Sequence, residues 1–297
     1  MNNFVFPEFT LIRIARKYNV CLITTIVDLL EVDYPEFLPS STVIFRKHLK
    51  KFFNLSTSYF IPITNFIKLD ALDSGLITKG SKCQIIEWGT DHFIPTRSTT
   101  NLDCASANEL NVSKALQPFF LFPAKAWAHK GHLEFLKAYG ANDSADFKVV
   151  FIGDLEPLRE EIEKLVSQLG SKGTKNINII GFVDDESREQ LMHDCRAVIL
   201  PSCYEGFGFP YFEATFLKKA VVSFRTKSYS EFFGDSENSI TVSNHDFDSF
   251  VRVLINFDDQ LVLEEIERKL ARIQLLTWNS CLKKTLDFYR EILQEIS

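Results

Sequence analysis

The stretch LPSCYEGFGFPYFEA, residues 200–214, indicates a sharp turn from a strand into a helix. It follows an apolar run, places two of the chain's 12 glycines two positions apart, and then reaches a proline. Glycines let a ligand come close to the backbone, and proline suits the first helical position because its missing N–H is not needed there. We therefore predict a strand over 197–201, a turn at Gly206 and Gly208, and a helix over 210–219 that starts at Pro210.

Two glutamates eight positions apart belong to the same stretch. Glu205 lies in the predicted loop and Glu213 lies one turn into the predicted helix, so both can face one crevice. Backbone N–H groups at a helix start favour negative charge or hydroxyl groups, and carboxylates accept hydrogen bonds from the two hydroxyls of a ribose or a hexose. A simpler explanation of each residue alone stays open, because the helix dipole by itself favours an acidic first turn and glycines often mark turns.

The surrounding chain alternates apolar runs with helix-period segments. The predicted strands are 118–124, 147–153, 177–183, 197–201, 220–224 and 239–242; the predicted helices are 132–140, 158–170, 186–195 and 210–219. Short continuous apolar runs are typical of strands buried on both faces, and helices between them indicate parallel crossovers. The pattern predicts a doubly wound α/β domain, in which ligands bind beyond the carboxyl ends of the strands. Gly206 and Gly208 fall at that edge.

The first third of the chain carries three further predicted strands, at 20–27, 56–64 and 83–89. A polar stretch without a pattern, 96–115, is the best candidate for a linker. At 297 residues the chain suggests two domains.

Composition and charge narrow the class of protein. Hydrophobic residues make up 45% and charged residues 24%, which is ordinary for a globular chain. The net charge of −6 argues against nucleic acid as a partner. The six cysteines are scattered without a C-x-x-C pair, so we interpret them as reduced intracellular thiols. With neither a signal peptide nor a long apolar span, we expect a cytoplasmic protein.

The pattern P-S-x-x-E-G-F-G-x-P-x-x-E-A resembles the retaining glycosyltransferases of family 4, which have the GT-B architecture of two facing Rossmann-like domains. The resemblance implies that Glu205, with Gly206, Phe207 and Gly208, holds the donor sugar, and that Glu213 holds the ribose of the nucleotide.

Other segments extend this resemblance over nearly the whole chain. Residues 122–139 resemble the family segment in which a basic residue and a lysine grip the donor diphosphate; Lys130 matches that lysine and Lys125 is the candidate for the other residue. Phe182 and Val183 match the stretch that lines the base pocket through its backbone. Glu205 and Lys130 are thus the expected catalytic residues. Because two ammonium groups can neutralise a leaving diphosphate, we expect no metal and no cofactor besides the nucleotide-sugar donor.

The resemblance also implies a division of the chain. We expect a partial N-terminal, acceptor-side Rossmann-like domain over 1–107, a nucleotide-sugar-binding domain over 108–277, and a helix over 278–297 that crosses back to the first domain. The opening β-α-β units of the family have no counterpart here, so a partner chain that completes the first domain is one expectation. Val27 stands where the family usually has a histidine beside the donor.

The implied activity is transfer of a hexose from a nucleotide-diphosphate sugar to a hydroxyl of a glycan or lipid-linked acceptor, with retention of configuration. The alternatives are an impaired nucleotide-sugar-binding protein or one subunit of a two-chain enzyme, and, less favoured, a related phosphorylase or epimerase. Residues 43–53 can form a basic amphipathic helix, which indicates either peripheral contact with the inner membrane face or a core helix with a basic outer side.

Two acidic sites have a simpler interpretation than metal binding. The D-x-D sequence at 246–248 precedes an apolar helical pattern, and Asp184 also precedes a predicted helix. We predict that both sites cap helices.

Overall fold

The computed structural model describes most of the chain and divides it into two compact units. The described residues are mainly 20–42, 59–94, 118–234, 240–258 and 275–296, without 79 and 244, and isolated residues within 14–18 and 266–273. One unit combines Met1–Gly89 with Leu276–Ser297, and the other is Thr90–Leu275. The predicted domain boundary at 107–108 and the predicted linker 96–115 lie outside the described residues.

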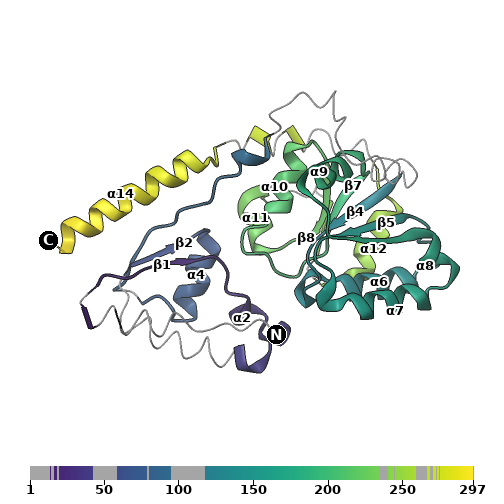
Figure 1. The fold of residues 1–297 in the computed structure, drawn as a ribbon, viewed down its shortest axis with the longest axis horizontal. Helices are drawn as coiled ribbons and strands as arrows, with labels where there is room; N and C mark the ends of the chain where they lie inside the picture. The colour runs from purple at the N-terminus through teal and green to yellow at the C-terminus, as the bar shows by residue number, and fades with distance from the viewer. Residues whose placement is uncertain are drawn as a thin grey trace. The chain divides into compact units, whose positions relative to one another are not determined.

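The larger unit contains a parallel sheet of six strands in the order β6-β5-β4-β7-β8-β9 (Figure 1). The strands are β4 (Phe119–Pro123), β5 (Lys148–Ile152), β6 (Ile177–Gly181), β7 (Ala197–Leu200), β8 (Ala220–Phe224) and β9 (Thr241–Val242). All residues of β7 and β8 are buried, because helices cover both faces of the sheet. The continuous apolar runs of the sequence are therefore strands, as predicted.

Helices connect these strands. They are α6 (His132–Ala141), α7 (Arg159–Gln168), α8 (Ser171–Asn176), α9 (Asp185–Asp194), α10 (Phe209–Phe216), α11 (Lys227–Phe233) and α12 (Phe247–Ile255). Figure 1 shows α6, α7 and α12 on one face of the sheet and α9, α10 and α11 on the other. The side chains of Asp184 and Asp246 accept hydrogen bonds from the backbone N–H groups of Ser187 and Ser249, so the two predicted caps are confirmed.

The smaller unit contains a three-stranded parallel sheet in the order β1-β2-β3. Its described elements are β1 (Ile23–Ile26), α2 (Leu30–Asp33), β2 (Tyr59–Pro62), α4 (Asn65–Asp73), β3 (Lys82–Cys83) and α14 (Trp278–Ile296), with a 3-10 turn η1 (Pro35–Phe37). The predicted strand over 83–89 is wrong for most of its length. Val27 directly follows β1 and is 40% exposed. Residues 43–53, the predicted amphipathic helix, lie outside the described residues.

The C-terminal helix α14 packs on this smaller unit although it is almost 200 residues distant in sequence (Figure 1). Phe288 and Ile292 of α14 form an apolar cluster with Ile61 and Ile86. Lys82 reaches Glu295 across the same contact at 2.7 Å. The unit is therefore built from an N-terminal segment and a C-terminal segment of the chain.

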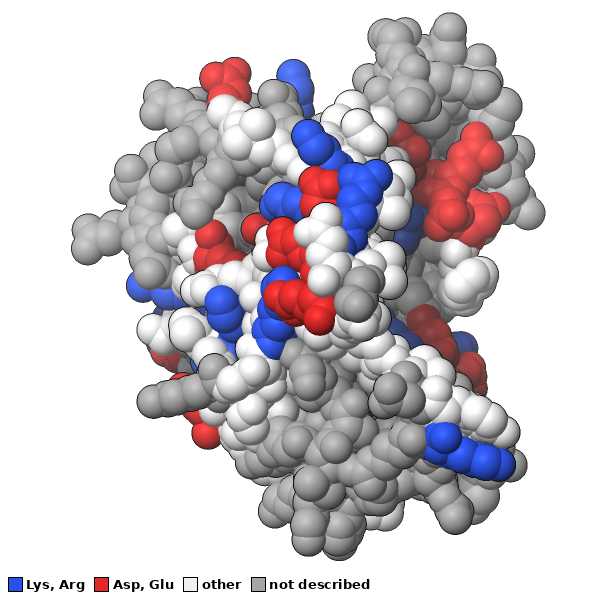
Figure 2. Space-filling view, turned by 90° about the vertical axis from the view of Figure 1, so that its left-hand side faces the viewer, with Lys and Arg blue, Asp and Glu red and all other residues white. Residues whose placement is uncertain are grey.

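Surface charge is mixed on the face that Figure 2 shows. Lysine and arginine side chains interleave with aspartate and glutamate side chains in a band across this face. In the parts of the chain that the structure describes, every helix is too short or too polar to cross a membrane.

Candidate functional site

The sheet of the larger unit has a topological switch point between β4 and β7. Strand order runs from β4 outward through β5 and β6, and then restarts beside β4 with β7, β8 and β9. In sheets of this topology, ligands bind at the carboxyl edge beside such a switch point. The two loops that carry the predicted catalytic residues are those that follow β4 and β7.

The loop after β4 is held tightly against the loop after β7. It contains a 3-10 turn, η3 (Ala128–Lys130), and then Gly131 with a φ of +80°. A Cβ atom on Gly131 would lie 2.5 Å from the carbonyl oxygen of Pro201, so only glycine fits. The backbone N–H of Cys203 also donates to the carbonyl of His129 at 2.8 Å. This close approach fixes the position of Lys130.

Lys130 and Glu205 form an ion pair across the switch point. The Lys130 Nζ donates to Glu205 Oε1 at 2.7 Å, and the side chains are only 18% and 9% exposed. Both charges are largely withdrawn from water, so each depends on the other for compensation. The structure thus brings the two predicted catalytic residues together from positions 75 apart in the chain.

The glycine turn leads directly into α10. Gly208 precedes the helix with a φ of +83°, and a Cβ there would overlap the ring of Tyr211. The Ser228 hydroxyl of α11 donates to the carbonyl of Phe207 at 2.6 Å and holds the turn from the other side. We predicted Pro210 as the first residue of this helix. The helix begins at Phe209, so Pro210 is its second residue. Pro210 still lies in the first turn of the helix, where the backbone N–H that proline lacks would have no partner within the helix.

The ring of Phe207 is buried and does not face outward. It packs against Phe209, Phe212 and Phe232, with ring centroids 4.9 to 5.1 Å apart. The half-buried Gly206 precedes it. Any contact of residue 207 with a ligand would therefore come from its backbone, while its side chain anchors the turn to the core.

Glu213 pairs with an arginine that the sequence patterns did not indicate. Arg188 of α9 places its Nε 3.1 Å from Glu213 Oε1, and the Glu213 side chain is 9% exposed. Burial raises the pKa of Glu213, and the positive charge of Arg188 opposes this rise. Arg188 also contacts the exposed Asp185 at 3.3 Å.

Two neutral groups lie beside the Lys130–Glu205 pair. Burial, reinforced by the charge of Lys130, lowers the pKa of His129 to about 4, so its imidazole is neutral at pH 7. Burial raises the pKa of Tyr211 well above its usual range, and the negative charge of Glu205 adds to the effect. The site near Glu205 therefore contains a neutral imidazole and a phenol that keeps its proton.

Lys125 contacts the loop that follows β5. Its Nζ lies 2.7 Å from Asp154 Oδ2, and both side chains are 41% exposed. The ammonium group also lies 5.0 Å from the ring centroid of Trp127. The hydrogen bond from Lys125 lowers the pKa of Asp154. Lys125 thus lies near the carboxyl edge but does not join the Lys130–Glu205 pair.

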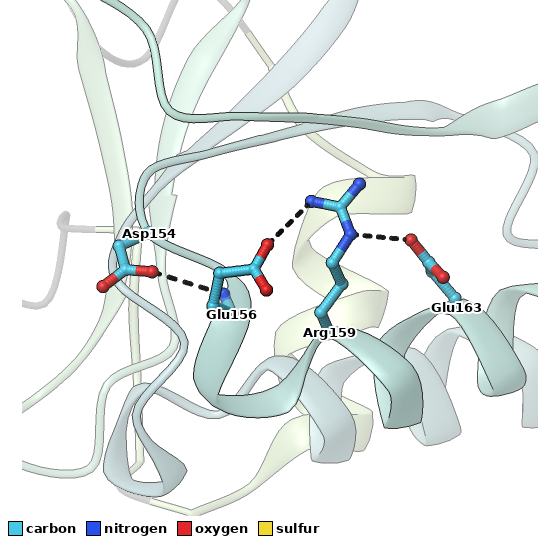
Figure 3. A network of polar contacts seen from close by, with 4 residues as sticks. All are labelled: Asp154, Glu156, Arg159 and Glu163. Carbon is cyan, nitrogen blue, oxygen red and sulfur yellow. Dashed lines mark hydrogen bonds and ion pairs between the residues drawn. The ribbon is translucent and has the colours of Figure 1, made fainter. Parts of the chain in front are cut away.

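A polar network continues from Asp154 along the start of α7 (Figure 3). Asp154 Oδ1 accepts the backbone N–H of Glu156 at 3.3 Å. Arg159 lies between two carboxylates, 3.5 Å from Glu156 and 2.9 Å from Glu163. The network links the loop after β5 to the first turn of α7.

The predicted base-binding stretch follows β6 directly. Gly181 ends the strand with a φ of +88°, and its Cα faces Arg159, whose Nη1 would lie 3.8 Å from an added Cβ. The side chain of Phe182 is 85% exposed, and the half-buried Val183 follows it. Both residues lie between the carboxyl end of β6 and the start of α9, the helix that carries Arg188.

Sequence reasoning missed Arg188 and Asp154. Arg188 is the fourth residue of α9 and follows no recognisable pattern; only the packing of α9 beside α10 brings it to Glu213. Asp154 directly follows the predicted strand 147–153, and this position at the carboxyl edge was the signal that could have identified it.

Comparison with curated proteins gives partial matches. The chain is 31% identical over 127 residues to an O-antigen chain mannosyltransferase B of Escherichia coli, which covers 41% of this chain and 33% of that protein. It is 30% identical over 147 residues to a D-inositol 3-phosphate glycosyltransferase of a Nocardioides strain, which covers 46% of this chain and 31% of that protein. The matched region therefore spans about a third of each relative.

Comparison with solved structures covers almost the whole chain. The crystal structure of HepE from Anabaena in complex with UDP and glucose superposes with a TM-score of 0.74 at 16% identity, over 96% of this chain and 75% of that one. The relation shows a common fold, and the predicted α/β, GT-B-like fold class is confirmed. The family model described as "Glycosyl transferases group 1" matches residues 109–266, more than half of the chain. The chain belongs to the glycosyl transferases group 1 family.

Proposed function

We propose that this protein is a retaining glycosyltransferase of family 4 that moves a hexose from a nucleotide-diphosphate sugar to a hydroxyl of a glycan or lipid-linked acceptor. The observation that carries the proposal is the buried Lys130–Glu205 pair at the switch point. It lies where ligands bind in sheets of this topology, and the glycine turn and Glu213 continue the same edge.

The proposed role of each residue follows from its chemistry. Lys130 supplies positive charge where negative charge grows on the departing diphosphate, and Lys125 on the rim adds to the field. Glu205 accepts hydrogen bonds from hydroxyls of the donor sugar, and the backbone of the glycine turn comes close to the same sugar. The acceptor hydroxyl attacks from the face that the diphosphate leaves, and the leaving phosphate takes its proton.

The nucleotide would extend along the carboxyl edge from the switch point. Glu213 would accept hydrogen bonds from the ribose, and the backbone of Phe182 and Val183 would contact the base. Because protein cations supply the positive charge, we expect turnover without a divalent metal, and the same rate in buffer with and without EDTA.

The relatives support a hexose donor in general terms. One is named a mannosyltransferase, and one structural neighbour was solved with UDP and glucose. The sequence matches cover about a third of the curated relatives.

The first test is calorimetric titration of the purified chain with UDP, GDP and ADP, beside the Glu213→Ala variant. We expect one nucleotide to bind and the variant to lose it. The matching sugar donors then test turnover, first as donor hydrolysis and then as transfer. A folded chain that binds none of the three nucleotides would overturn the proposal.

A second candidate function is favoured by Val27. This exposed aliphatic side chain after β1 stands where a hydrogen-bonding histidine is common, so the chain could bind a nucleotide sugar without rapid turnover or act as one subunit of a two-chain enzyme. Donor binding without hydrolysis, or co-purification of a second chain that restores turnover, would favour this candidate. Val27→His should raise turnover if the side chain is the only deficiency.

We propose a cytoplasmic location with peripheral contact at the inner membrane face. The proposal is supported by the basic and apolar residues interleaved over 43–53 in the sequence. Sedimentation with anionic and neutral lipid vesicles tests it, and equal binding to both would contradict it.

A further inference from the structure

We propose that Arg188 is a positioning residue for ribose recognition, which holds the Glu213 carboxylate ionised and oriented toward the two ribose hydroxyls. The inference rests on the proposed function, in which Glu213 receives the ribose. Arg188 touches Glu213 and acts through it.

The geometry gives the arginine a specific partner. Arg188 reaches from α9 to α10 and places its Nε 3.1 Å from Glu213 Oε1. Its other contact, with Asp185 at 3.3 Å, ends on a carboxylate that is 97% exposed. An exposed pair is weakened by water and salt, so the buried Glu213 is the partner that benefits from the arginine's charge.

The contact leaves Glu213 able to accept other donors. The ion pair places Nε beside one carboxylate oxygen, Oε1. A carboxylate has about four acceptor positions, and the two hydroxyls of a ribose need two of them.

Charge is the reason that Glu213 needs this neighbour. Burial favours the protonated form of a carboxyl group, and Asp185 and Glu189 on α9 push in the same direction. Arg188 is the group that favours the ionised form. A protonated carboxyl has lost one acceptor oxygen to its own proton, so it cannot receive both ribose hydroxyls equally well.

The test measures ribose recognition and not only affinity. UDP, GDP and ADP and their 2′-deoxy forms are titrated into the wild type and into Arg188→Gln, Arg188→Lys and Glu213→Gln, at pH 6 and pH 8. Arg252→Gln is the matched control, because Arg252 is an exposed helical arginine on α12 that contacts Ser249. Thermal unfolding shows which variants are folded.

We expect Arg188→Gln to bind the preferred ribonucleotide about tenfold more weakly, the effect of one charged interaction. The preference for ribose over 2′-deoxyribose should fall toward that of Glu213→Gln. Removing the positive charge raises the pKa of Glu213 further, so the variant should lose more affinity than the wild type between pH 8 and pH 6. Arg188→Lys should recover much of the preference.

Two results would overturn this inference and leave the proposed function intact. Wild-type affinity in Arg188→Gln would show that Glu213 needs no partner. An equal loss for ribose and deoxyribose forms would show that Arg188 contacts the diphosphate directly. If the folded wild type binds no nucleotide, the proposed function fails and this inference fails with it. If Arg188→Gln does not fold, Arg188→Lys decides. Because lysine keeps the positive charge beside Glu213, a folded Arg188→Lys whose ribose preference falls to that of Glu213→Gln would overturn the inference.

Discussion

Two lysines of the same loop make ion pairs of equal length in different surroundings. Lys130 meets Glu205 and Lys125 meets Asp154, each with a closest N···O distance of 2.7 Å. The first pair lies at the switch point with side chains 18% and 9% exposed, whereas both side chains of the second pair are 41% exposed. From the distance alone, the two ion pairs would be expected to be equally strong.

Because the two ion pairs differ in burial, we expect them to differ in their contribution to stability. An exposed pair gains little because water and salt already solvate both charges. A buried pair has given up that solvation, so removal of one partner leaves the other uncompensated. The same loop therefore carries one buried lysine whose position the fold fixes, and one lysine that solvent can reach.

The largest expected effect is at the buried pair. Lys130→Met and Glu205→Gln should each lower donor turnover by about 10²–10³-fold, because each removes a group that stabilises charge or holds the sugar. Each should also lower stability by up to about 3 kcal/mol, since a charge stays behind without its partner. Steady-state turnover and urea unfolding measure the two effects.

The double variant Lys130→Met/Glu205→Gln sharpens this result. It removes both charges, so it should regain stability relative to either single variant while turnover stays low. Wild-type turnover in either single variant would refute the site assignment. A double variant as unstable as the sum of the singles would show that the two residues do not depend on each other.

The next effect is at the glycine that positions Lys130. Gly131→Ala places a Cβ 2.5 Å from the Pro201 carbonyl oxygen at a φ of +80°, so the loop must shift and Lys130 with it. We expect a loss of about 2 kcal/mol or more in unfolding free energy, together with reduced turnover.

Gly170→Ala is the control for that variant. Gly170 also has a positive φ, of +60°, but nothing lies within 4 Å of an added Cβ. Its ψ of −133° lies outside the left-handed helical region, in a conformation almost confined to glycine, so Gly170→Ala should lose about 1–3 kcal/mol through backbone strain but keep full turnover. An equal loss of turnover in the two variants would show that the contact with the loop after β7 is unimportant.

The smallest effect is expected at the exposed pair. Lys125→Met and Asp154→Asn should each leave the thermal midpoint within about 2 °C of the wild type, because surface changes of this kind matter little for stability. Lys125→Met should weaken nucleotide binding about fivefold, less than Lys130→Met, and the loss should shrink in high salt. An effect on stability as large as that of Lys130→Met would show that burial does not distinguish the two ion pairs.

The predictions from sequence succeeded where the local pattern and the tertiary environment agree. The strands β4, β5, β7 and β8 lie within the predicted ranges, because burial on both faces demands a continuous apolar run. Helix α8 was not predicted, since its sequence SKGTKN has no apolar period. Cys83 is the only residue of the predicted strand 83–89 that lies in a strand, β3, although the N–H groups of Gln84 and Ile86 still donate to the carbonyls of Phe60 and Pro62 in β2.

The site was predictable to a similar degree. The glycine turn, Glu205, Glu213 and Lys130 follow from local patterns and from the family resemblance. The direction of the Phe207 ring could not be predicted in this way. Its aromatic neighbours Phe212 and Phe232 lie on α10 and α11, and the packing of these helices brings them to the ring.

The local sequence is enough to predict the kinds of elements and the glycine turn before α10, because apolar period, glycine and proline act over a few residues. Which charges meet depends on the tertiary structure. Strand order reverses between β4 and β7, so Lys130 and Glu205 become neighbours, and α9 comes to lie beside α10, so Arg188 reaches Glu213. Those contacts depend on how distant strands are ordered in the sheet, and no spacing along the chain contains that information.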